Sequence, residues 1–450
     1  MIVCKFGGTS VADAATIGRL VRIVETRLDD RPLIVVSALA GVTDALLALA
    51  RAAYERDAGK VKEGLDGLAR RHASTARELP GGEVALDAIE EDVKALASEI
   101  EGTTGRMPRP ADVDAIASRG ELWSSRLVAA AMAGAGLSPA WVDIRPIMVT
   151  DDRFSRATPY TQVLNKRARE CLTPLIDAGL VPVTQGFIGA TPDGVPTTLG
   201  RGGSDFTAAL LGAALSASRV EIWTDVDGLM TADPRIVPAA RTLRAASYEE
   251  AAELATFGAR VLHPATAMPL VRAGIPIVVL NARRPEQPGT TVAPSAELER
   301  VGDSPIRSIS WKKGITVINV RAPRMLGAFG FLRAMFEVFE RHEVVVDVLA
   351  SGEVSVSLTV EDRSRLDAVV RELSELGEVW LEDRRAIVAV VGIGLRHTPG
   401  LAARLFKAVQ PANVEVISQG ASAINMTFVV REEDGPDVVR RLHAEFFGAC

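Results

Sequence analysis

Cysteine and histidine are scarce in this 450-residue sequence. Its three cysteines, at positions 4, 171 and 450, are odd in number and far apart. This pattern is typical of reduced thiols in a cytoplasm, not of a disulfide framework. The five histidines and the cysteines form no cluster with metal-ligand spacing, so we expect no structural zinc site and assign no metal ligand.

Long apolar runs are also absent. The most apolar stretches, such as 127–137, are short, rich in Ala and Gly, and flanked by charge. A membrane-spanning helix needs about 20 consecutive apolar residues. At the N-terminus, acidic residues and glycines interrupt the sequence before a secretory apolar region could form. We therefore expect a cytoplasmic protein with no membrane partner.

Neither sign of charge is in large excess. There are 51 basic and 57 acidic residues, for a formal net charge of -6. This balance argues against a nucleic-acid partner. With 48% hydrophobic and 24% charged residues, the composition is that of a globular protein, and its length indicates two or three domains.

The first 285 residues alternate short β-branched runs with longer helical patterns. The runs that predict strands are 2–6, 33–37, 140–144, 181–188, 220–224 and 275–280, and helical patterns include 12–27, 111–133, 204–217 and 248–255. Residues 57–101 indicate a helical hairpin around Pro80-Gly81-Gly82. This alternation predicts an α/β domain with a mainly parallel sheet between helices, which binds ligands at the carboxyl ends of the strands.

A linker and an internal repeat follow this region. Segment 283–305 is rich in Pro, Gly and charge, and it marks a domain boundary. Residues 316–360 then align without a gap on 386–430, and each copy reads strand, helix, strand, strand, helix. This order is typical of ferredoxin-like βαββαβ domains. We predict a catalytic domain over 1–285, a linker over 286–305, and two domains over 306–385 and 386–450, with strands exchangeable between the last two.

"KFGGTS", residues 5–10, follows the first predicted strand. Its two glycines allow the backbone to approach a ligand closely, and the next helix directs its N-terminus at the same place. With Lys5 they form an anion site suited to phosphate, although the spacing is not that of a P-loop. A tight turn beside a surface lysine is the alternative interpretation.

Three more loops rich in glycine or hydroxyl groups follow predicted strands. They are "SALAGVTD" at 37–44, "TLGRGGSD" at 198–205 and "WTDVDGLMTADPR" at 223–235. Each alone is explained by a capped helix or a plain turn. Because all should converge on one edge of a parallel sheet, together they predict a phosphoryl-transfer site.

The sequence resembles the aspartate kinases of the amino-acid kinase family. The resemblance rests on "KFGGTSV", "SRGELWSS", "GFIGATPDGVPTTLGRGGSD", "WTDVDGLMTADPR" and "FGARVLHP", and the C-terminal repeat is similar to tandem ACT domains. The nearest class is the monofunctional, lysine-sensitive one. The resemblance implies the amino-acid kinase fold and ATP-dependent phosphorylation of the L-aspartate side chain to 4-phospho-L-aspartate, the first step toward lysine, threonine and methionine.

The resemblance also implies a nucleotide site. Lys5 is expected to hold the transferring phosphoryl group and, with Asp205, to be catalytic, while Mg²⁺ bridges the ATP phosphates through water. The remaining positions expected to contact ATP are Phe6, Gly7, Gly8, Thr224, Asp225, Met230, Arg235 and Arg260. Met230 and Arg260 stand where relatives often carry an aromatic residue and a lysine. His263 is interpreted as a packed structural residue.

By the same resemblance Arg201 suits the α-carboxylate of aspartate, because its planar fork can hold both oxygens. Glu121 suits the α-ammonium, and the remaining positions assigned to aspartate are Ser37, Thr43 and Ser204. Asp205 would orient Lys5 or the ammonium. An exposed helix carboxylate is the alternative for Glu121, and a helix cap is the alternative for Asp205.

The first ACT-like copy is expected to bind a lysine effector. The implied positions are Met325, Phe331, Val346, Asp347 and Ser351, with Asp347 balancing the lysine ammonium. A solvated carboxylate at a strand end is the alternative for Asp347, and Gly352 replaces a serine common in lysine-sensitive relatives. ACT domains often pair across subunits, so a homodimer or tetramer is expected.

Two other functions remain open from the sequence. One is an amino-acid kinase for another carboxylate, of the N-acetylglutamate type. The other is an amino-acid sensor whose kinase domain is inactive. The presence of Lys5, Glu121, Arg201 and Asp205 speaks against the second.

Overall fold

The computed structural model describes residues 1–103, 105–257, 264–294, 305–325 and 329–448. The chain divides into two compact units. The first contains 1–229, 244–248 and the described part of 261–298, and the second contains 230–243, 249–257 and the described residues after 304.

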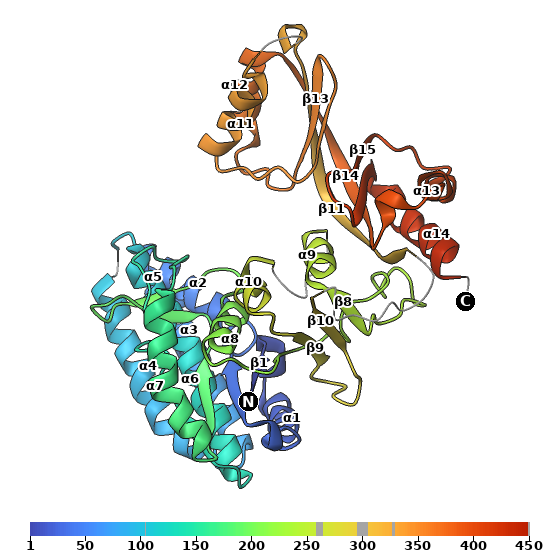
Figure 1. Cartoon of the computed structure of the whole chain (residues 1–450). Coiled ribbons are helices and arrows are strands. Elements are labelled where there is room, and N and C mark those ends of the chain that lie inside the picture. The colour runs from blue at the N-terminus through green and yellow to red at the C-terminus, as the bar shows by residue number, and fades with distance from the viewer. Residues whose placement is uncertain (104, 258–263, 295–304, 326–328, 449–450) are drawn as a thin grey trace. The chain divides into compact units, whose positions relative to one another are not determined.

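An eight-stranded sheet forms the centre of the first unit, in the order β3-β4-β2-β1-β7-β9-β10-β8 (Figure 1). Its strands are β1 (Ile2–Phe6), β2 (Pro32–Val36), β3 (Pro139–Trp141), β4 (Val181–Gln185), β7 (Val220–Thr224), β8 (Ala245–Ser247), β9 (Ile277–Asn281) and β10 (Thr290–Ala293). All neighbours are parallel except β9 and β10. This arrangement confirms the predicted α/β class. A separate hairpin contains β5 (Ile188–Ala190) and β6 (Pro196–Thr198).

Helices cover both faces of this sheet, and the alternation along β1 shows the reason. Ile2, Cys4 and Phe6 face the apolar core that includes the layer of α1 and α6. Val3 and Lys5 face the opposite layer, which contains α8. The helices of the unit are α1 (Ala14–Glu25), α2 (Val42–Tyr54), α3 (Ala58–Glu78), α4 (Glu83–Thr103), α5 (Pro110–Ala117), α6 (Arg119–Gly134), α7 (Thr161–Asp177), α8 (Gly203–Ala214) and α10 (Pro264–Ala273).

Two stretches differ from the sequence-based expectation. The helix predicted over 111–133 is divided at Ser118 into α5 and α6, which differ in direction. Residues 290–293, placed in the predicted linker, form β10 instead. Gly289, at φ +65°, reverses the chain, and the β-branched Thr290 and Val292 are buried against β9.

The second unit contains a six-stranded antiparallel sheet in the order β12-β13-β11-β14-β16-β15. Its strands are β11 (Ile306–Arg321), β12 (Leu349–Ser351), β13 (Ser355–Val360), β14 (Glu378–Gly392), β15 (Val416–Gln419) and β16 (Asn425–Arg431), and its helices are α9 (Tyr248–Thr256), α11 (Phe331–Arg341), α12 (Leu366–Leu376), α13 (Leu401–Val409) and α14 (Gly435–Phe447). Tyr248 at the start of α9 belongs to the first unit.

The register explains how the two ferredoxin-like copies share this sheet. The second half of β11, 315–321, pairs with 378–385 of β14, completing the first copy. The first half of β11, 306–313, pairs with 386–392 and supplies the fourth strand of the second copy. That strand precedes the first copy in the chain, whereas the sequence pattern places the whole second copy after 386. Two long strands therefore join the copies into one sheet.

Candidate active site

The carboxyl ends of β1, β2, β4 and β7 lie at one edge of the central sheet, because these strands are parallel and in register. The loops that follow β1 and β2 meet the N-terminus of α8 there and enclose a cavity of about 560 Å³. Eight of the residues singled out from sequence line it: Lys5, Gly8, Ser37, Thr43, Glu121, Arg201, Ser204 and Asp205.

Lys5 and Asp205 form an ion pair in this cavity. The Lys5 Nζ atom lies 2.6 Å from Asp205 Oδ1, and their side chains are 11% and 18% exposed. Lys5 comes from the central strand, and Asp205 comes from the first turn of α8. The carboxylate therefore fixes the ammonium at a helix N-terminus, where backbone N–H groups favour a bound anion.

Glu121 is buried in the first turn of α6, with 3% of its surface exposed. Its Oε1 atom accepts a hydrogen bond from the Ala38 amide at 3.3 Å, and its Oε2 atom is buried without a partner. Burial raises the pKa of the Glu121 carboxyl to about 8, and the Ala38 amide opposes this shift. The alternative of an exposed helix carboxylate is thus wrong. A cationic ligand group beside the Oε2 atom would favour the ionised form of this carboxyl group.

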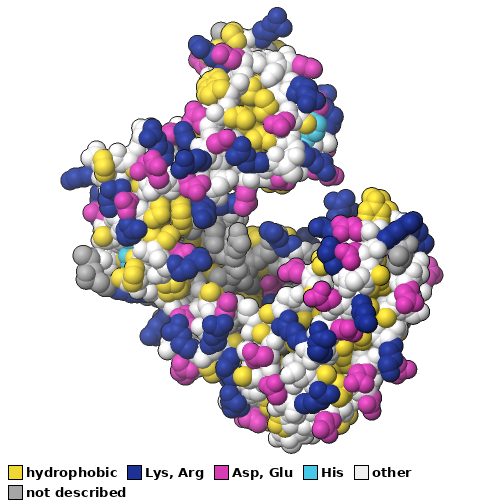
Figure 2. All heavy atoms as spheres, turned by 180° about the vertical axis from the view of Figure 1, so that it is seen from behind, with side chains coloured by type: hydrophobic (Ala, Val, Ile, Leu, Met, Phe, Trp, Pro, Cys, Tyr) yellow, Lys and Arg dark blue, Asp and Glu magenta, His cyan; other side chains and the backbone are white. Residues whose placement is uncertain are grey.

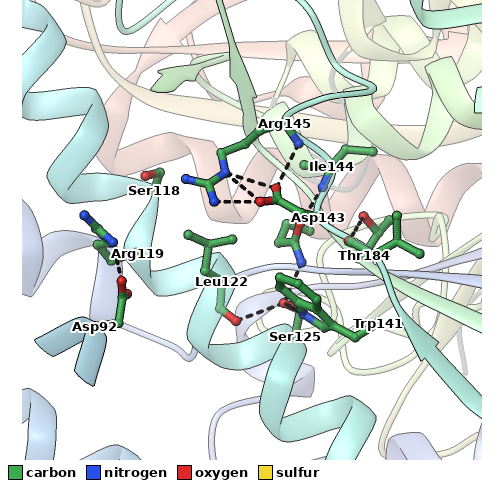
Figure 3. Close-up of polar contacts among 12 residues, drawn as sticks. Asp92, Ser118, Arg119, Leu122, Ser125, Trp141, Asp143, Ile144, Arg145 and Thr184 are labelled. Carbon is green, nitrogen blue, oxygen red and sulfur yellow. Dashed lines mark hydrogen bonds and ion pairs between the residues drawn. The ribbon is translucent and has the colours of Figure 1, made fainter. Parts of the chain in front are cut away.

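Side-chain hydrogen bonds and an ion pair hold α6, the helix that carries Glu121, in place (Figure 3). Ser125 accepts hydrogen bonds from the Trp141 indole N–H at 2.9 Å and from the Gln185 side-chain amide at 2.7 Å. Ser124 donates to the main-chain oxygen of Ser37 at 2.7 Å. At the start of the helix, Arg119 pairs with Asp92 of α4. The same helix therefore supports the loop after β2 and carries the Glu121 carboxylate.

Arg201 lies on the loop between β6 and α8. Gly200 and Gly202 flank it with φ of +75° and +72°, values that only glycine adopts without strain. The arginine is exposed toward the cavity, and among the described residues no hydrogen bond or ion pair of its guanidinium is found. Its fork is therefore free for an anionic ligand.

Close packing of main chains shapes the wall of the cavity. A Cβ atom on Gly8 would lie 3.1 Å from the Ala38 carbonyl oxygen and 3.5 Å from Ala40 Cα. Across the cavity, Ser37 Oγ donates to Ser204 Oγ at 3.0 Å. The glycine thus lets the loops after β1 and β2 approach each other, and the paired hydroxyls connect the second loop to α8.

Several predicted nucleotide residues do not line this cavity. The Phe6 side chain is in the core, stacked on Trp223 with ring centroids 5.9 Å apart, because it lies on the opposite face of β1 from Lys5. The Gly7 N–H donates to the Trp223 carbonyl at 3.3 Å and so continues the β1–β7 pairing. In this structure the Gly7 amide is engaged by the sheet, and the contact of Gly7 with ATP stays a prediction.

The other predicted nucleotide residues lie at the end of β7 and beyond. Thr224 donates to the adjacent Asp225 carboxylate at 3.3 Å. Met230 and Arg235 belong to the second compact unit, where Asp233 holds the Arg235 guanidinium through both nitrogens of its fork. Arg260 and His263 lie outside the described residues.

The structure adds residues to which the sequence analysis assigned no role. Asp114 of α5 lines the cavity and is 1% exposed. Phe187 and the Ala38 amide also face the site. The only signal for Asp114 in the sequence is an acidic residue at a position that the apolar pattern of the helix would bury. No motif marks it.

In the second unit, the predicted effector residues lie around the first copy. Met325, Phe331 and Val346 pack against its core, and Ser351 is exposed at the end of β12. Asp347 lies 3.4 Å from the Lys312 ammonium, which also pairs with Glu361 at 2.8 Å. Burial raises the pKa of Asp347, and the neighbouring Lys312 opposes this shift. Asp347 is 12% exposed, so the alternative of a solvated carboxylate is wrong.

The described part of the chain contains neither a metal-binding group of side chains nor a membrane-spanning helix. No three His, Cys, Asp or Glu side chains there come together in a group able to hold a metal ion. None of the helices in these ranges combines the length and the apolar character that crossing a membrane requires.

Comparisons with known proteins agree with this geometry. The amino acid kinase family matches residues 1–281, and an ACT domain matches 388–446. The lysine-sensitive aspartokinase 3 of Escherichia coli (strain K12) is 39% identical over 459 residues, covering 99% of each chain. Crystal structures of E. coli aspartokinase III superpose on 99% of this chain at 38% identity. The complex with aspartate and ADP (R-state) gives a TM-score of 0.86, and the complex with lysine and aspartate (T-state) gives 0.84.

The fold and the cavity thus define an amino acid kinase with C-terminal ACT domains. A family match over more than half of the chain and the full-length relatives place it more narrowly: the chain belongs to the aspartokinases of the amino acid kinase family.

Proposed function

We propose that this chain is an aspartate kinase that converts ATP and L-aspartate to ADP and 4-phospho-L-aspartate. One observation carries the proposal: a single cavity joins the Lys5–Asp205 ion pair to the buried Glu121 carboxyl group, whose Oε2 atom has no partner among the described residues, and to the Arg201 guanidinium, which has none there either. These groups are complementary to a phosphoryl group, an ammonium and a carboxylate, respectively.

The chemical step needs no general base. The side-chain carboxylate of aspartate is already ionised at neutral pH, and one of its oxygens attacks the γ-phosphorus of ATP. The bond from this phosphorus to the bridging oxygen breaks, and ADP leaves with its electron pair. Lys5 stabilises the charge that spreads over the transferring group, and positioning supplies most of the remaining acceleration.

Recognition of aspartate uses charges at two places. Arg201 binds the α-carboxylate through two parallel hydrogen bonds, and Glu121 accepts the α-ammonium. Ser37, Thr43 and Ser204 supply hydroxyls between them. An N-acetylated substrate brings no ammonium to the buried Glu121 carboxylate, so the geometry favours free aspartate over N-acetylglutamate.

The nucleotide approaches from the ends of β1 and β7, with Lys5 at its γ-phosphate and with Thr224 and Asp225 beside the nucleoside. A Mg²⁺ ion that accompanies ATP would be held by phosphate oxygens and water, since the described residues offer no cluster of acidic ligands. The ion neutralises phosphate charge, while this chain contributes Lys5, the amides of its loops and the N-terminus of α8.

Regulation is assigned to the second unit, with lysine as its effector at the first ACT-like copy. The E. coli relative is described as lysine-sensitive. In this chain Met325, Phe331, Val346, Asp347 and Ser351 are proposed to form the binding site. The domain limits 1–285, 286–305, 306–385 and 386–450 stay predictions, with 290–293 pairing in the central sheet and 306–313 pairing with the second copy.

Assembly through the first ACT-like copy accounts for its exposed apolar surface. Figure 2 shows hydrophobic side chains gathered on the lobe that contains α11 and α12 in Figure 1. Leu332, Phe336 and Val345 are 39%, 41% and 75% exposed. A homodimer or tetramer would cover such a surface.

Cys4 and Cys171 are unpaired thiols, which supports a cytoplasmic location.

An ADP-release assay with L-aspartate tests the proposal. Wild-type turnover with aspartate is expected, none with N-acetyl-L-glutamate, and a loss of about 10³-fold in Lys5→Ala. Trapping of the product by hydroxylamine as a hydroxamate identifies the acyl phosphate. Wild-type turnover no greater than that of Lys5→Ala would favour an amino-acid sensor with an inactive kinase domain.

A further inference from the structure

Asp114 accepts four hydrogen bonds although it is almost completely buried. Its Oδ2 atom accepts from the backbone N–H groups of Ser155 and Thr198 at 2.8 and 2.7 Å. Its Oδ1 atom accepts from the hydroxyls of the same two residues at 3.2 and 2.9 Å. Every partner comes from a segment more than 40 residues away in sequence, so this carboxylate joins three parts of the chain.

The two joined segments carry the loop of Arg201. Thr198 ends β6, three residues before the arginine, and its carbonyl accepts a hydrogen bond from the Ala157 N–H at 2.9 Å. Ser155 has a φ of +66°, a left-handed conformation that is strained for a non-glycine residue. A Cβ atom on Gly200 would lie 2.9 Å from the Ser155 carbonyl oxygen. The Asp114 carboxylate holds both segments in this arrangement.

The position of Asp114 in the chain connects its hydrogen bonds with Ser155 and Thr198 to Glu121, the residue proposed to bind the α-ammonium of aspartate. Asp114 lies in α5, and Glu121 lies in the first turn of α6, which follows directly. Both residues line the same cavity. One short segment, 114–121, therefore carries the Glu121 carboxylate at its end and secures the Arg201 loop at its beginning.

We propose that Asp114 is a positioning residue that sets the separation between the Arg201 guanidinium and the Glu121 carboxylate, and thereby the selection for an α-amino acid of aspartate size with a free α-carboxylate. This inference rests on the proposed function. The Asp114 carboxylate uses both of its oxygens to bind Ser155 and Thr198. It acts through the loop that carries Arg201.

Two variants of Asp114 separate this role from general stability. Asp114→Ala removes both acceptor oxygens and with them all four hydrogen bonds, and we expect KM for aspartate to rise about 10- to 100-fold with KM for ATP changed less than about 3-fold. Asp114→Asn can keep the geometry. Its carbonyl oxygen accepts from the two N–H groups, and its NH₂ donates to the two hydroxyls, which rotate to accept. We expect it to restore KM for aspartate to within about 3-fold of wild type.

Selectivity supplies a second readout. L-Aspartate α-amide lacks the charge that Arg201 binds, so the wild type should discriminate strongly against it. Asp114→Ala should reduce that discrimination about 10-fold, because the displaced guanidinium no longer favours the carboxylate. Asp143→Ala is a matched control. Asp143 also accepts a backbone N–H, that of Arg145 at 3.0 Å, and it does not line the cavity.

Equal loss of kcat in Asp114→Ala and Asp114→Asn, with KM for aspartate and the discrimination unchanged, would overturn the inference. If Asp114→Ala does not fold, the double variant Ser155→Ala/Thr198→Val removes only the hydroxyl donors. A rise of about 3-fold or more in its KM for aspartate supports the inference, and an unchanged KM overturns it. Failure of the proposed function appears separately, as a wild type without aspartate-dependent turnover.

Discussion

The ammonium of Lys5 and the carboxylate of Asp205 meet at 2.6 Å although 200 residues separate them. One side chain projects from the central strand β1 and the other from the first turn of α8. The pair places one positive charge at the carboxyl edge of the sheet, in front of a helix N-terminus. The Asp205 carboxylate orients the Lys5 ammonium and offsets part of the free-energy cost of burying its charge.

Removal of the Lys5 ammonium should abolish phosphoryl transfer. We expect Lys5→Ala to lower kcat about 10³-fold, because no other cation of the cavity lies at the same strand end. Asp205→Asn should lower kcat less, about 10-fold, since the ammonium remains but is oriented less well. Steady-state kinetics with saturating ATP and aspartate measures both. Equal kcat in wild type and Lys5→Ala would contradict the assignment.

Aspartate binding should release a proton below pH 8. The free enzyme holds Glu121 protonated up to a pKa of about 8, and the α-ammonium of the substrate favours the ionised form. The Kd for aspartate should therefore fall up to about 10-fold per pH unit as the pH rises toward 8, and level off above it. Calorimetry in buffers of different ionisation enthalpy counts the proton. A Kd that stays constant between pH 6 and 8 would refute this linkage.

The same carboxyl group should reduce the stability of the empty enzyme at alkaline pH. Its folded-state pKa is above the ordinary glutamate value of 4.5, so between pH 4.5 and about 8 the unfolded chain binds fewer protons than the folded one. Stability is lost as the pH rises through this window. Glu121→Gln does not titrate and should be more stable than wild type at pH 8 by a few kcal/mol, with the difference vanishing near pH 4.5. Urea denaturation at both pH values tests this.

Gly8→Ala should move the wall of the active site. The added Cβ atom would lie 3.1 Å from the Ala38 carbonyl oxygen, which is main chain and cannot rotate away. We expect kcat/KM to fall about 10-fold and Tm to fall by a few degrees. The matched control is Gly18→Ala within α1, where the nearest atom to a new Cβ is 3.8 Å away. It should raise stability by about 1 kcal/mol with kcat unchanged. Equal kinetics in both variants would contradict the close approach.

The Lys312 side chain should weaken inhibition of the enzyme by the free amino acid lysine. Its ammonium lies 3.4 Å from Asp347, the carboxylate proposed to bind the effector ammonium. Lys312→Met would remove this competitor, and we expect the lysine concentration for half-inhibition to fall about 3- to 10-fold. Asp347→Ala should abolish inhibition while kcat without lysine stays near wild type. Titration of activity with lysine, with threonine as the control, measures both. A Lys312→Met curve identical to that of wild type would show that the two ammonium groups do not share Asp347.

Much of the fold follows from local patterns. The runs 2–6 and 220–224 match β1 and β7 residue for residue, because β-branched segments flanked by glycine and polar turns have few alternatives. The division at Ser118 was not predicted, since the apolar period continues through it. The edge strand β10 was also missed, because its four residues are surrounded by Pro, Gly and charge.

The sequence by itself determined the α/β class, the repeated βαββαβ copies and most of the charged groups around the cavity. These features depend on side-chain periodicity and on short motifs at strand ends, which are local properties of the chain. Only the tertiary structure decided that Phe6 faces the core, that the Gly7 amide belongs to the sheet, and that Asp114 clamps the Arg201 loop. Each of these depends on which distant segment packs alongside. Burial and hydrogen bonding between segments about 40 to 220 residues apart therefore decide which of the candidate groups can face the substrate.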